Sequence, residues 1–576
     1  MNNSQIADHL ETLADLLEFQ GANSFRTNAY RNGARQIRQL SNSIEGLIAD
    51  GFDLTTLEGI GKSVSEKCHE LVERGRLKQV EEILETVPPS VLDLLKVPKL
   101  GPKKAAALFQ QLNIATLDQL KAACEAHRVQ ELPGFGAKSE QAILDGIAIA
   151  AAANERILWA EADQIVSQLR EHFANCKAIR KIEFGGSYRR GKETVGDLDI
   201  LVDASDADSV MDRLAEFPGV ASIIGRGPTK MSIRLETGFA IDLRVVPHES
   251  FGAALQYFTG NKEHNVTLRK IAKEKELKLN EWGVFPEDDP ENSIAGKTEE
   301  EVYRVFGMDW IPPELRENRG EIEWALQGKI PPLLEQKQIR GDLHMHTTAT
   351  DGAASIAEMA AAARAAGYEY IAITDHSKRV SMARGLDENR LLAQWREIDE
   401  LNATFDGKFL VLKGIECDIL EAGGMDLSDE VLSQADWVIA SIHYGQNQPM
   451  AQITARIIGA IENPNVSVIA HPTGRLLNRR DPYEVDMHAV MEAAVQNRKL
   501  LELNASPRRL DLNDVHLIAA RELKIPIVIN TDAHHPNALK DMRYGVVQAR
   551  RAALSAVHVA NTLPWNKLKK LIGRKS

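Results

Sequence analysis

The spacing of hydrophobic residues divides the chain into an all-helical first part and mixed later parts. Through residues 1–150, apolar residues recur every three or four positions, and short glycine and proline breaks separate the segments. This spacing predicts helices that each bury one face. Residues 147–170 continue the pattern without a break, so we expect one long helix that leads into the next domain.

From Lys181 the pattern changes to short hydrophobic runs with turns between them. Such runs are typical of strands, and a helical, charged stretch follows them. They predict a second domain that contains both a sheet and helices. The runs are KIEF, LDILVD, MSIRLE and FAIDLRVV.

A third pattern begins near residue 340, where strand-like runs alternate with helical ones. This alternation predicts a βα-repeat domain, expected to form a barrel. Two Pro-Pro pairs and many charges between Pro312 and Arg340 predict a linker before it. The strand-like runs are GDLHMH, YIAITDH, FLVLKGIE, WVIASIH, VSVIAHP, LLELNA and IPIVINTDAH.

Length and composition fit a protein of several soluble domains. With 576 residues the chain is too long for one hydrophobic core, and 44% hydrophobic with 26% charged residues is ordinary for globular proteins. No apolar run has membrane-spanning length, and the N-terminus lacks the features of a signal peptide. Four distant cysteines without a paired motif fit a reducing compartment. We therefore expect a cytoplasmic protein with no membrane partner.

The net charge of −13 is unfavourable for a nucleic-acid partner but does not exclude one. Salt screens exposed charges beyond roughly 8 Å, so local patches decide whether a phosphate binds. Acidic metal ligands also add negative charge, while the cations that they hold serve phosphate chemistry.

A short glycine pattern occurs three times in the helical part, as LEGIGK, VPKLGPK and LPGFGAK. It resembles the helix-hairpin-helix motif, in which a glycine turn directs backbone N–H groups at a DNA phosphate without reading the sequence. The alternative is an ordinary turn between packed helices, which the repetition disfavours. The second copy has Lys99 in place of the motif's first glycine. The expected phosphate-binding glycines are Gly59, Gly61, Gly101, Gly134 and Gly136.

Three carboxylates form the clearest candidate for catalysis. Asp197 and Asp199 are two positions apart in a strand-like run, so both side chains leave the same face. Asp242 lies on the second arm of a hairpin that turns near Gly238. Together they can hold two Mg²⁺ or Mn²⁺ ions for phosphoryl transfer. The alternative, a solvated strand end, does not account for the third aspartate.

The segment GGSYRRG precedes these aspartates and fits a triphosphate. Its glycine pair allows the backbone to approach a phosphate closely. Ser187 and Arg190 are placed to donate to the phosphate oxygens.

With these motifs, residues 1 to about 318 resemble the family X DNA polymerases typified by polymerase beta. The resemblance implies that Tyr257-Phe258-Thr259-Gly260 senses the sugar of the nucleotide. It implies that Asn265 and Arg269 contact the minor groove of the new base pair. Lys262 departs from the family, because the animal enzyme has an acid there. The implied nucleotide-binding residues are Ser187, Arg190, Gly196, Arg156, Tyr257, Phe258, Gly260 and Asn265; the implied DNA contacts include Lys67, Arg244 and Arg269.

Some members of this family remove a deoxyribose phosphate through a lysine Schiff base. Lys67 matches that lysine, and its alternative is an exposed helix lysine without a catalytic role. Arg26 stands where the relative has a second functional lysine, which weighs against lyase activity.

Histidines and acids gather at the ends of the strand-like runs in the C-terminal part. Asp342, His344 and His346 alternate along the first run and share a face. Barrel enzymes place their active sites at such strand ends, and burying these groups without compensation is costly. The series therefore predicts a metal site, and its mixed ligands suit Mn²⁺, Zn²⁺ or Fe²⁺ better than Mg²⁺.

Residues 338–576 resemble the PHP (polymerase and histidinol phosphatase) domains, in which nine ligands hold three metals. The resemblance implies metal-dependent hydrolysis of a phosphodiester. Arginines near the motifs, including Arg475 and Arg509, are candidates for holding a DNA backbone or for solvated surface charge. The matching ligands are His344, His346, Asp351, His376, Glu416, His443, His471, Asp532 and His534.

The two halves together resemble the bacterial family X polymerases. The expected fold class is multidomain: a helical helix-hairpin-helix N-terminal region, an α+β nucleotidyltransferase palm and thumb, and a C-terminal α/β distorted TIM-like PHP barrel. The expected domains are a lyase-like domain at 1–88, a fingers-like domain at 89–150, a palm at 151–252, a thumb at 253–318, a linker at 319–337 and a PHP domain at 338–576.

The implied function is gap-filling repair synthesis with 3′→5′ exonuclease activity, and abasic-site cleavage is a further candidate. The expected partners are gapped or primer-template DNA and deoxynucleoside triphosphates, the expected oligomeric state is a monomer, and the two sites are expected to act independently. One alternative is a DNA-binding scaffold with an inactive polymerase and an active phosphoesterase. Another is a PHP domain that hydrolyses small phosphate esters.

Overall fold

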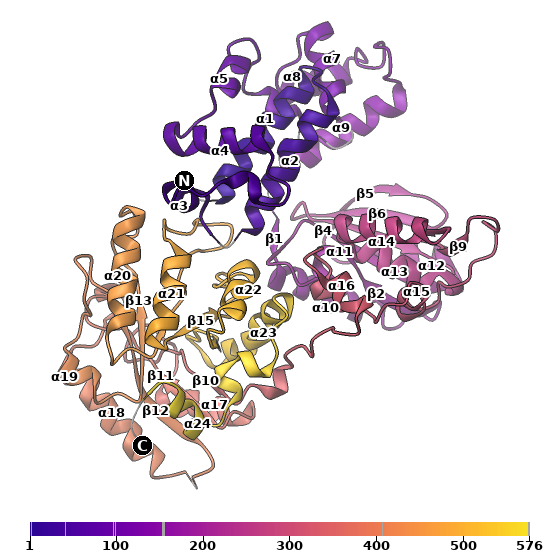
Figure 1. Ribbon diagram of the computed structural model, residues 1–576. Coiled ribbons are helices and arrows are strands. Elements are labelled where there is room, and N and C mark those ends of the chain that lie inside the picture. Colours follow the sequence, from indigo (N-terminus) through magenta and orange to yellow (C-terminus); the bar gives the residue numbers. More distant parts are fainter. Residues whose placement is uncertain are drawn as a thin grey trace. The chain divides into compact units, whose positions relative to one another are not determined.

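A computed structural model describes residues 1, 3–40, 42–95, 97, 100–152, 156–405 and 407–573. The chain forms two compact units (Figure 1). The first comprises Met1–Glu155 with Asp486–His488, and the second comprises Arg156–Val485 with Ala489–Ser576.

The first unit is helical, as predicted, and its helices share one hydrophobic core. Helix α1 buries Ile6, Leu10, Leu13 and Leu17, which recur at the spacing of one helix face. The core continues to Ile147, so the boundary expected at residue 88 does not divide it. The helices are α1 (Asn3–Phe19), α2 (Ser24–Gln39), α3 (Ile44–Ala49), α4 (Lys62–Arg74), α5 (Lys78–Leu84), α6 (Val91–Leu95), α7 (Pro102–Leu112), α8 (Leu117–Glu125) and α9 (Ala137–Ala152).

The single long helix expected over 147–170 is wrong. Helix α9 ends at Ala152, a short strand β1 (Ile157–Leu158) follows, and a new helix α10 (Trp159–Phe173) begins; residues 153–155 lie outside the described part. The break is stabilised in two ways. Strand β1 pairs with β3 (Thr194–Val195), and the Glu161 carboxylate accepts the backbone N–H of Leu158 at 2.8 Å.

The palm is a mixed sheet with strand order β2-β4-β7-β6-β5. Leu198, Ile200 and Val202 of β4 are fully buried, so the alternate positions occupied by aspartates lie on the other face. Strands β4 and β7 run parallel, and Asp199 is directly opposite Asp242. The elements are β2 (Ile179–Phe184), α11 (Gly186–Arg189), β4 (Asp197–Ala204), α12 (Ala207–Ala215), β5 (Val220–Arg226), β6 (Lys230–Leu235) and β7 (Ala240–Val245).

The thumb follows, and the segment expected to be a linker is folded onto it. Ile322 and Ala325 of helix α16 are buried in the thumb core. Arg316 is fully buried and donates to Glu299 at 2.6 Å. At least one charge that predicted a linker is therefore paired inside the domain, whereas Lys337 and Glu335 pair at the surface. The elements are α13 (Phe251–Thr259), α14 (Lys262–Glu274), β8 (Leu277–Asn280), β9 (Gly283–Pro286), α15 (Glu299–Val305) and α16 (Glu321–Leu326).

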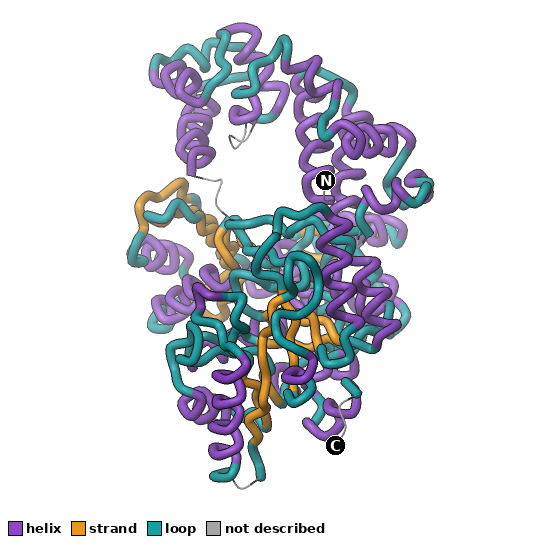
Figure 2. The backbone as a smooth tube through the Cα atoms, turned by 90° about the vertical axis from the view of Figure 1, so that its left-hand side faces the viewer, coloured by secondary structure: helices purple, strands orange, loops and turns teal. Residues whose placement is uncertain are grey.

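The C-terminal part is a βα-repeat barrel, as predicted. Its strands pair in parallel in the order of the sequence, and a bridge from Met345 to Ala533 joins the first and last segments, so the barrel is nearly closed. Figure 2 shows these strands in orange with helices in purple around them. The strands are β10 (Gly341–Asp342), β11 (Tyr370–Ile373), β12 (Leu410–Asp418), β13 (Trp437–Ser441), β14 (Val468–Ile469), β15 (Leu500–Asn504) and β16 (Ile527–Asn530).

Helices connect and cover these strands, which are buried on both faces. They are α17 (Ile356–Ala365), α18 (Glu388–Asn402), α19 (Asp429–Leu432), α20 (Met450–Glu462), α21 (Met487–Asn497), α22 (Asp514–Glu522), α23 (Met542–Arg551) and α24 (Trp565–Leu571). In the described part of the chain, no helix has the length and apolarity needed to cross a membrane.

Candidate active sites

The three glycine hairpins share one backbone geometry. In each, an apolar residue between or before the glycines donates its N–H to a carbonyl three residues back, at 3.0–3.1 Å. These residues, Ile60, Leu100 and Phe135, are buried and anchor the turn. A helix begins directly after each turn, at α4, α7 and α9. The first N–H groups of such helices have no intrahelical acceptor and face outward, which suits a phosphate.

Gly59 and Gly134 have φ of +76° and +85°, a conformation that favours glycine. A Cβ at Gly61, Gly101 or Gly136 would meet nothing within 4 Å, so the backbone there is open to a ligand. Lys99 of the second copy lies outside the described residues.

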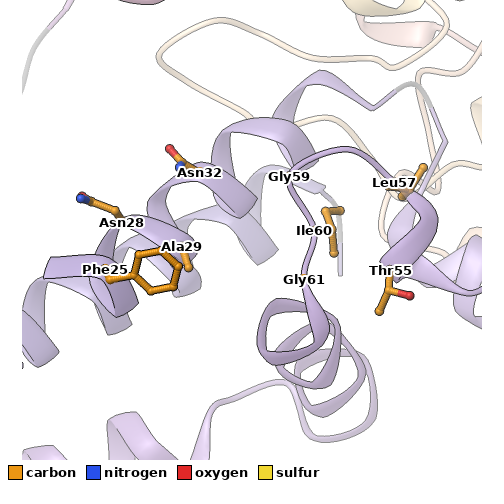
Figure 3. A pocket seen from close by; sticks show the side chains of 9 residues that line it. All are labelled: Phe25, Asn28, Ala29, Asn32, Thr55, Leu57, Gly59, Ile60 and Gly61. Carbon is orange, nitrogen blue, oxygen red and sulfur yellow. The ribbon is translucent and has the colours of Figure 1, made fainter. Parts of the chain in front are cut away.

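A cavity of about 510 Å³ lies beside the first hairpin. Figure 3 shows Phe25 and Ala29 on α2 and the turn with Gly59 and Gly61 as parts of its wall. The Phe25 side chain is 83% exposed. Sequence reasoning missed Phe25, because a helical spacing alone does not distinguish a buried ring from one that faces a cavity.

Lys67 lies on α4 and is not an exposed lysine. Its ammonium forms an ion pair with Glu70 at 2.7 Å, and only 19% of its side chain is accessible. The candidate Schiff-base amine is thus held by a neighbouring carboxylate.

The palm aspartates converge on one face of the sheet. Asp199 on β4 and Asp242 on β7 are directly paired neighbours, and Asp197 lies two positions before Asp199 on β4. Burial raises the pKa of Asp199 to about 7, and the charges of Asp197 and Asp242 add to this effect. Such mutual repulsion is what divalent cations relieve, so the residues fit a metal site. Lys230 also pairs with Asp242 at 3.1 Å, a contact that the sequence pattern did not indicate.

The glycine pair of GGSYRRG is required by close packing against β4, the strand that carries Asp197 and Asp199. Gly185 donates its N–H to the carbonyl of Asp199 at 2.8 Å. Gly186 has a φ of +61°, and a Cβ there would lie 2.9 Å from an Asp199 carboxylate oxygen. Any side chain would therefore displace the carboxylate, so the glycine loop must pack closely against the strand that carries the aspartates.

Arg156 and Gly196 also lie at this site. The Arg156 guanidinium donates to the hydroxyl and the carbonyl of Thr194, at 2.9 and 2.6 Å. A Cβ at Gly196 would lie 2.9 Å from Arg156. The structure thus brings both residues next to Asp197.

The Tyr257–Gly260 segment packs beside the same loop. A Cβ at Gly185 would lie 3.2 Å from the carbonyl oxygen of Phe258, and the Arg244 guanidinium covers the Phe258 ring at 4.5 Å. Asn265 is buried; its Oδ1 accepts from the Gln256 amide at 2.7 Å, and its Nδ2 donates to the carbonyl of Tyr257 at 2.8 Å.

Arg269 lies one helical turn after Asn265 and is exposed. It is therefore accessible to a ligand, whereas the amide of Asn265 is engaged within the protein.

The Arg190 guanidinium reaches the thumb. Its Nε donates to Glu317 at 3.1 Å, and its NH1 donates to the carbonyl of Thr259. Ser187 lies three residues earlier, in the short helix α11. The loop is thus positioned by the backbone of the segment expected to sense the sugar, at Thr259, and by the Glu317 side chain at the end of the thumb.

The nine predicted PHP ligands come together in one cluster, which is buried at its centre and open at Asp351 and His534. Glu416 lies at its centre, within 2.8–3.6 Å of His344, His346, His376, His443 and His471. Asp532 is 3.1 Å from His346, and Asp351 lies within 3.4–3.8 Å of His346, His376 and His534. Three subsets could each hold an ion, with their ligand atoms within 4.8 Å of one another; they are His346-Asp351-His376-His534, His344-His346-Glu416 and His376-Glu416-His443.

The polar atoms of this cluster fit divalent cations. Among the described residues, His344 Nε2, His346 Nδ1 and Glu416 Oε2 are buried without a hydrogen-bond partner. Burial lowers the pKa of His376, but Glu416 and Asp351 raise it to about 10. Buried lone pairs that face one another in this way need a cation or protons, and mixed nitrogen and oxygen donors suit divalent ions.

Two carboxylates that the prediction missed hold the histidine ligands. Glu502 accepts from His344 Nδ1 at 2.7 Å, and Asp418 accepts from His443 Nδ1 at 3.0 Å. Both are fully buried. A sequence signal existed, because Glu502 interrupts the apolar run LLELN and Asp418 lies two positions after Glu416 on one strand.

Asp342 is not part of the cluster, although it alternates with His344 and His346. It is fully buried and accepts from the backbone N–H of Thr531 at 3.1 Å. It therefore joins the first strand of the barrel to the last.

Arg475 is neither a DNA contact nor a solvated charge. It is buried, and its guanidinium donates to Glu193 of the palm at 3.1 Å. Arg509 differs, because its Nε lies 3.5 Å from the candidate ligand Asp532 and remains next to the metal cluster.

Comparisons with known proteins agree with this layout. Family models match the DNA polymerase beta palm over residues 156–222, the DNA polymerase beta thumb over 254–317 and the PHP domain over 342–506. A helix-hairpin-helix domain matches 1–77, and a SAM-like helix-hairpin-helix tandem matches 91–148. The multidomain fold class predicted from the sequence is confirmed.

Full-length and partial relatives are known. The DNA polymerase/3′-5′ exonuclease PolX of Bacillus subtilis (strain 168) is 41% identical over 563 residues, 97% of each chain. A probable phosphatase of Thermoanaerobacter sp. (strain X514) is 33% identical over 204 residues, 34% of this chain and 78% of the relative. DNA polymerase lambda of Rattus norvegicus is 24% identical over 353 residues, 55% of this chain and 56% of the relative.

Proposed function

The chain belongs to the family X DNA polymerases that carry a C-terminal PHP domain, and we propose that it both extends and shortens DNA 3′ ends during repair. It is a DNA-directed DNA polymerase with 3′→5′ exonuclease activity, and synthesis and hydrolysis take place at separate sites. One observation carries this assignment. A chain that aligns with PolX over 97% of its length contains both a set of three palm aspartates and a separate set of histidines and acids in the barrel.

Synthesis is assigned to the palm. Asp197, Asp199 and Asp242 would hold two Mg²⁺ or Mn²⁺ ions, which supply charge stabilisation to the attacking and leaving oxygens of nucleotidyl transfer. Ser187 and Arg190 would bind the triphosphate, because they follow a glycine pair that lies against Asp199. Arg156, Gly196, Tyr257, Phe258, Gly260 and Asn265 would shape the rest of the nucleotide pocket, and Arg244 and Arg269 would contact DNA.

Hydrolysis is assigned to the PHP barrel. Up to three divalent ions, Mn²⁺, Zn²⁺ or Fe²⁺, would be held by the nine ligands and would supply the Lewis acidity that phosphodiester cleavage requires. Glu502 and Asp418 orient the rings of His344 and His443 by fixing which nitrogen carries the proton. Arg509 is placed to hold a phosphate beside Asp532.

The glycine hairpins would hold the DNA backbone by their amides, independently of sequence. Short gaps are the proposed substrate, and the Phe25 cavity is a place for an unstacked base or a sugar-phosphate end. Lys67 is not assigned lyase activity, because Glu70 engages its amine.

One assay tests the proposal. A labelled primer opposite a short gap is incubated with Mn²⁺, with and without deoxynucleoside triphosphates, and primer length is followed in both directions. Extension with nucleotides and shortening without them are expected. The absence of extension would leave only a DNA-binding phosphoesterase.

The match to a probable phosphatase supports a second candidate, namely that the barrel hydrolyses a small phosphate ester. Single-stranded DNA and p-nitrophenyl phosphate compared at equal concentration would distinguish the two. Faster hydrolysis of the DNA is expected, because the DNA-binding hairpins belong to the same chain.

A further inference from the structure

Helix α23 of the PHP barrel packs against the palm loop that precedes the catalytic aspartates. Both belong to the second compact unit. Tyr544 of α23 meets the ring of Trp159 edge-on at 5.4 Å, and Trp159 stacks on Tyr188 at 5.3 Å. Arg543 and the Tyr188 hydroxyl both donate to Asp163. The loop 185–191 is therefore covered by an aromatic and ionic contact that originates in the PHP barrel.

The end of α23 also holds the backbone of this loop. Gln548 donates from its amide to the carbonyl of Gly191 at 2.8 Å, and Arg551 donates to the carbonyl of Arg190 at 2.6 Å. Gly191 has a φ of +65°, and a Cβ there would lie 2.2 Å from Val547 Cγ1. The last two residues of the loop are thus fixed by hydrogen bonds and by close packing.

Arg551 acts on the side chain of Arg190 as well. It is almost fully buried and donates to Glu317 at 3.0 Å and to Asp514 at 2.6 Å. Glu317 in turn accepts from Arg190 Nε. Burial by itself would raise the pKa of Glu317, but the cations around it, Arg551 first, lower it to about 2.

We propose that Arg551 and Gln548 are positioning residues for nucleotide binding, so that the PHP barrel completes the polymerase site by fixing the 185–191 loop. This inference rests on the proposed role of Ser187 and Arg190 in binding the triphosphate. A loop with glycines at both ends loses much conformational freedom on ordering, and contacts that order it beforehand improve binding. The expectation that the two sites act independently is thereby limited, because one domain contributes structure to the other's site.

Arg550 provides a matched control on the same helix. Its guanidinium donates to Glu314 at 2.7 Å and to the carbonyl of Leu334 at 3.1 Å. These contacts also join α23 to neighbouring segments, but they do not involve the loop. A general loosening of the interface would affect Arg550→Ala and Arg551→Ala alike, whereas loss of loop positioning would affect only Arg551→Ala.

The experiment measures binding of the complementary deoxynucleoside triphosphate to full-length enzyme on a gapped DNA with a dideoxy-terminated primer. The variants are Arg551→Ala, Arg551→Lys, Gln548→Ala and Arg550→Ala, with thermal melting as a check of folding. Arg551→Ala is expected to raise the nucleotide Kd about tenfold or more, since it removes charge-assisted buried hydrogen bonds. Gln548→Ala should raise it by a smaller factor, and Arg551→Lys should restore part of the loss.

Arg550→Ala should bind nucleotide within about twofold of the wild type, because its partners lie away from the loop. The Kd for gapped DNA and the exonuclease rate of Arg551→Ala should also stay within about twofold. Equal losses in Arg550→Ala and Arg551→Ala, or wild-type nucleotide binding by Arg551→Ala, would overturn the inference. If Arg551→Ala does not fold, Gln548→Ala decides, because it removes one neutral hydrogen bond.

Ser187→Ala separates this inference from the proposed function. If Ser187→Ala binds nucleotide normally, the loop is not the triphosphate site, and the proposed function fails. If Ser187→Ala loses binding while Arg551→Ala and Gln548→Ala do not, only the positioning role fails.

Discussion

The aspartate site of the palm and the histidine site of the barrel differ in how much of each exists before substrate arrives. In the palm, Asp197 is exposed and Asp242 is 30% accessible. In the barrel, the central ligands His344 and Glu416 are at most 1% accessible and Glu502 holds His344 in place, and only the outer ligands Asp351 and His534 are as open as the palm aspartates. A buried, preoriented donor set binds ions by itself, whereas an open carboxylate set needs the oxygens of a bound triphosphate to complete an ion's coordination. We therefore expect resident metals in the barrel and metals that arrive with nucleotide in the palm.

The largest effect should come from removing a ligand of the preformed site. His344→Ala should reduce primer shortening by at least about a thousandfold, because the loss of metal-supplied stabilisation amounts to several kcal/mol. Gap filling should persist within about threefold, because the contacts of the His344 side chain are with Glu502, Glu416 and Asp532 of the barrel and not with the palm loop. Circular dichroism checks folding. Retained shortening would place the nuclease elsewhere, for example in reversal of synthesis at the palm.

A smaller effect is expected from the carboxylates that hydrogen-bond the histidine ligands. Glu502→Gln keeps the size of the side chain but removes the carboxylate that holds His344 Nδ1, and should weaken metal retention or hydrolysis by about 10- to 100-fold. Asp418→Asn tests the same relation at His443. Metal content after dialysis and exonuclease rate are measured together. Unchanged metal content and rate in both variants would mean that the ligands are held by the fold alone.

On the palm side, Arg269→Ala should have an effect of about tenfold, equivalent to about 1.4 kcal/mol. Arg269 is exposed on α14 and is proposed to contact DNA near the new base pair, so the change should appear in insertion efficiency on matched and mismatched templates. Binding to gapped DNA should change little. If Arg269→Ala and the wild type have the same insertion kinetics on the matched and on the mismatched template, Arg269 does not belong to the site.

The smallest expected effect tests whether the barrel holds its metals before substrate binds. Chelation with EDTA should lower the melting temperature of the second unit by a few degrees, because resident ions bind the folded barrel and not the unfolded chain. The same treatment should leave the melting of His344→Ala nearly unchanged. Equal shifts in both proteins would contradict resident metals in the barrel.

The sequence predicted most of the fold and failed where tertiary contacts override local pattern. The barrel strands and the aspartate hairpin follow from alternation and from strand-end chemistry, which are local signals. The long helix over 147–170 fails because β1 pairs with β3, a partner more than 30 residues away. The linker near residue 320 fails because Glu299 and Arg316 neutralise each other inside the thumb.

In the candidate sites, too, local sequence patterns predicted some residues, and tertiary contacts determined the roles of the others. Motifs named the residues that could hold metals, but the roles of Glu502 and Arg551 depend on which strands and helices meet in space. Arg551 in particular is an ordinary arginine at a helix end in the sequence, and only its contacts with Arg190 and Glu317 reveal its place beside the palm loop.

The most direct test of two separate active sites in one chain is the Asp199→Asn variant, assayed for extension and shortening of one labelled primer on gapped DNA with Mn²⁺. Asp199 lies opposite Asp242 and against Gly186, so its loss should reduce extension by at least about a thousandfold. Shortening should stay within about threefold of the wild type, because the barrel keeps all of its ligands. Normal extension, or loss of both activities in a folded protein, would contradict the account.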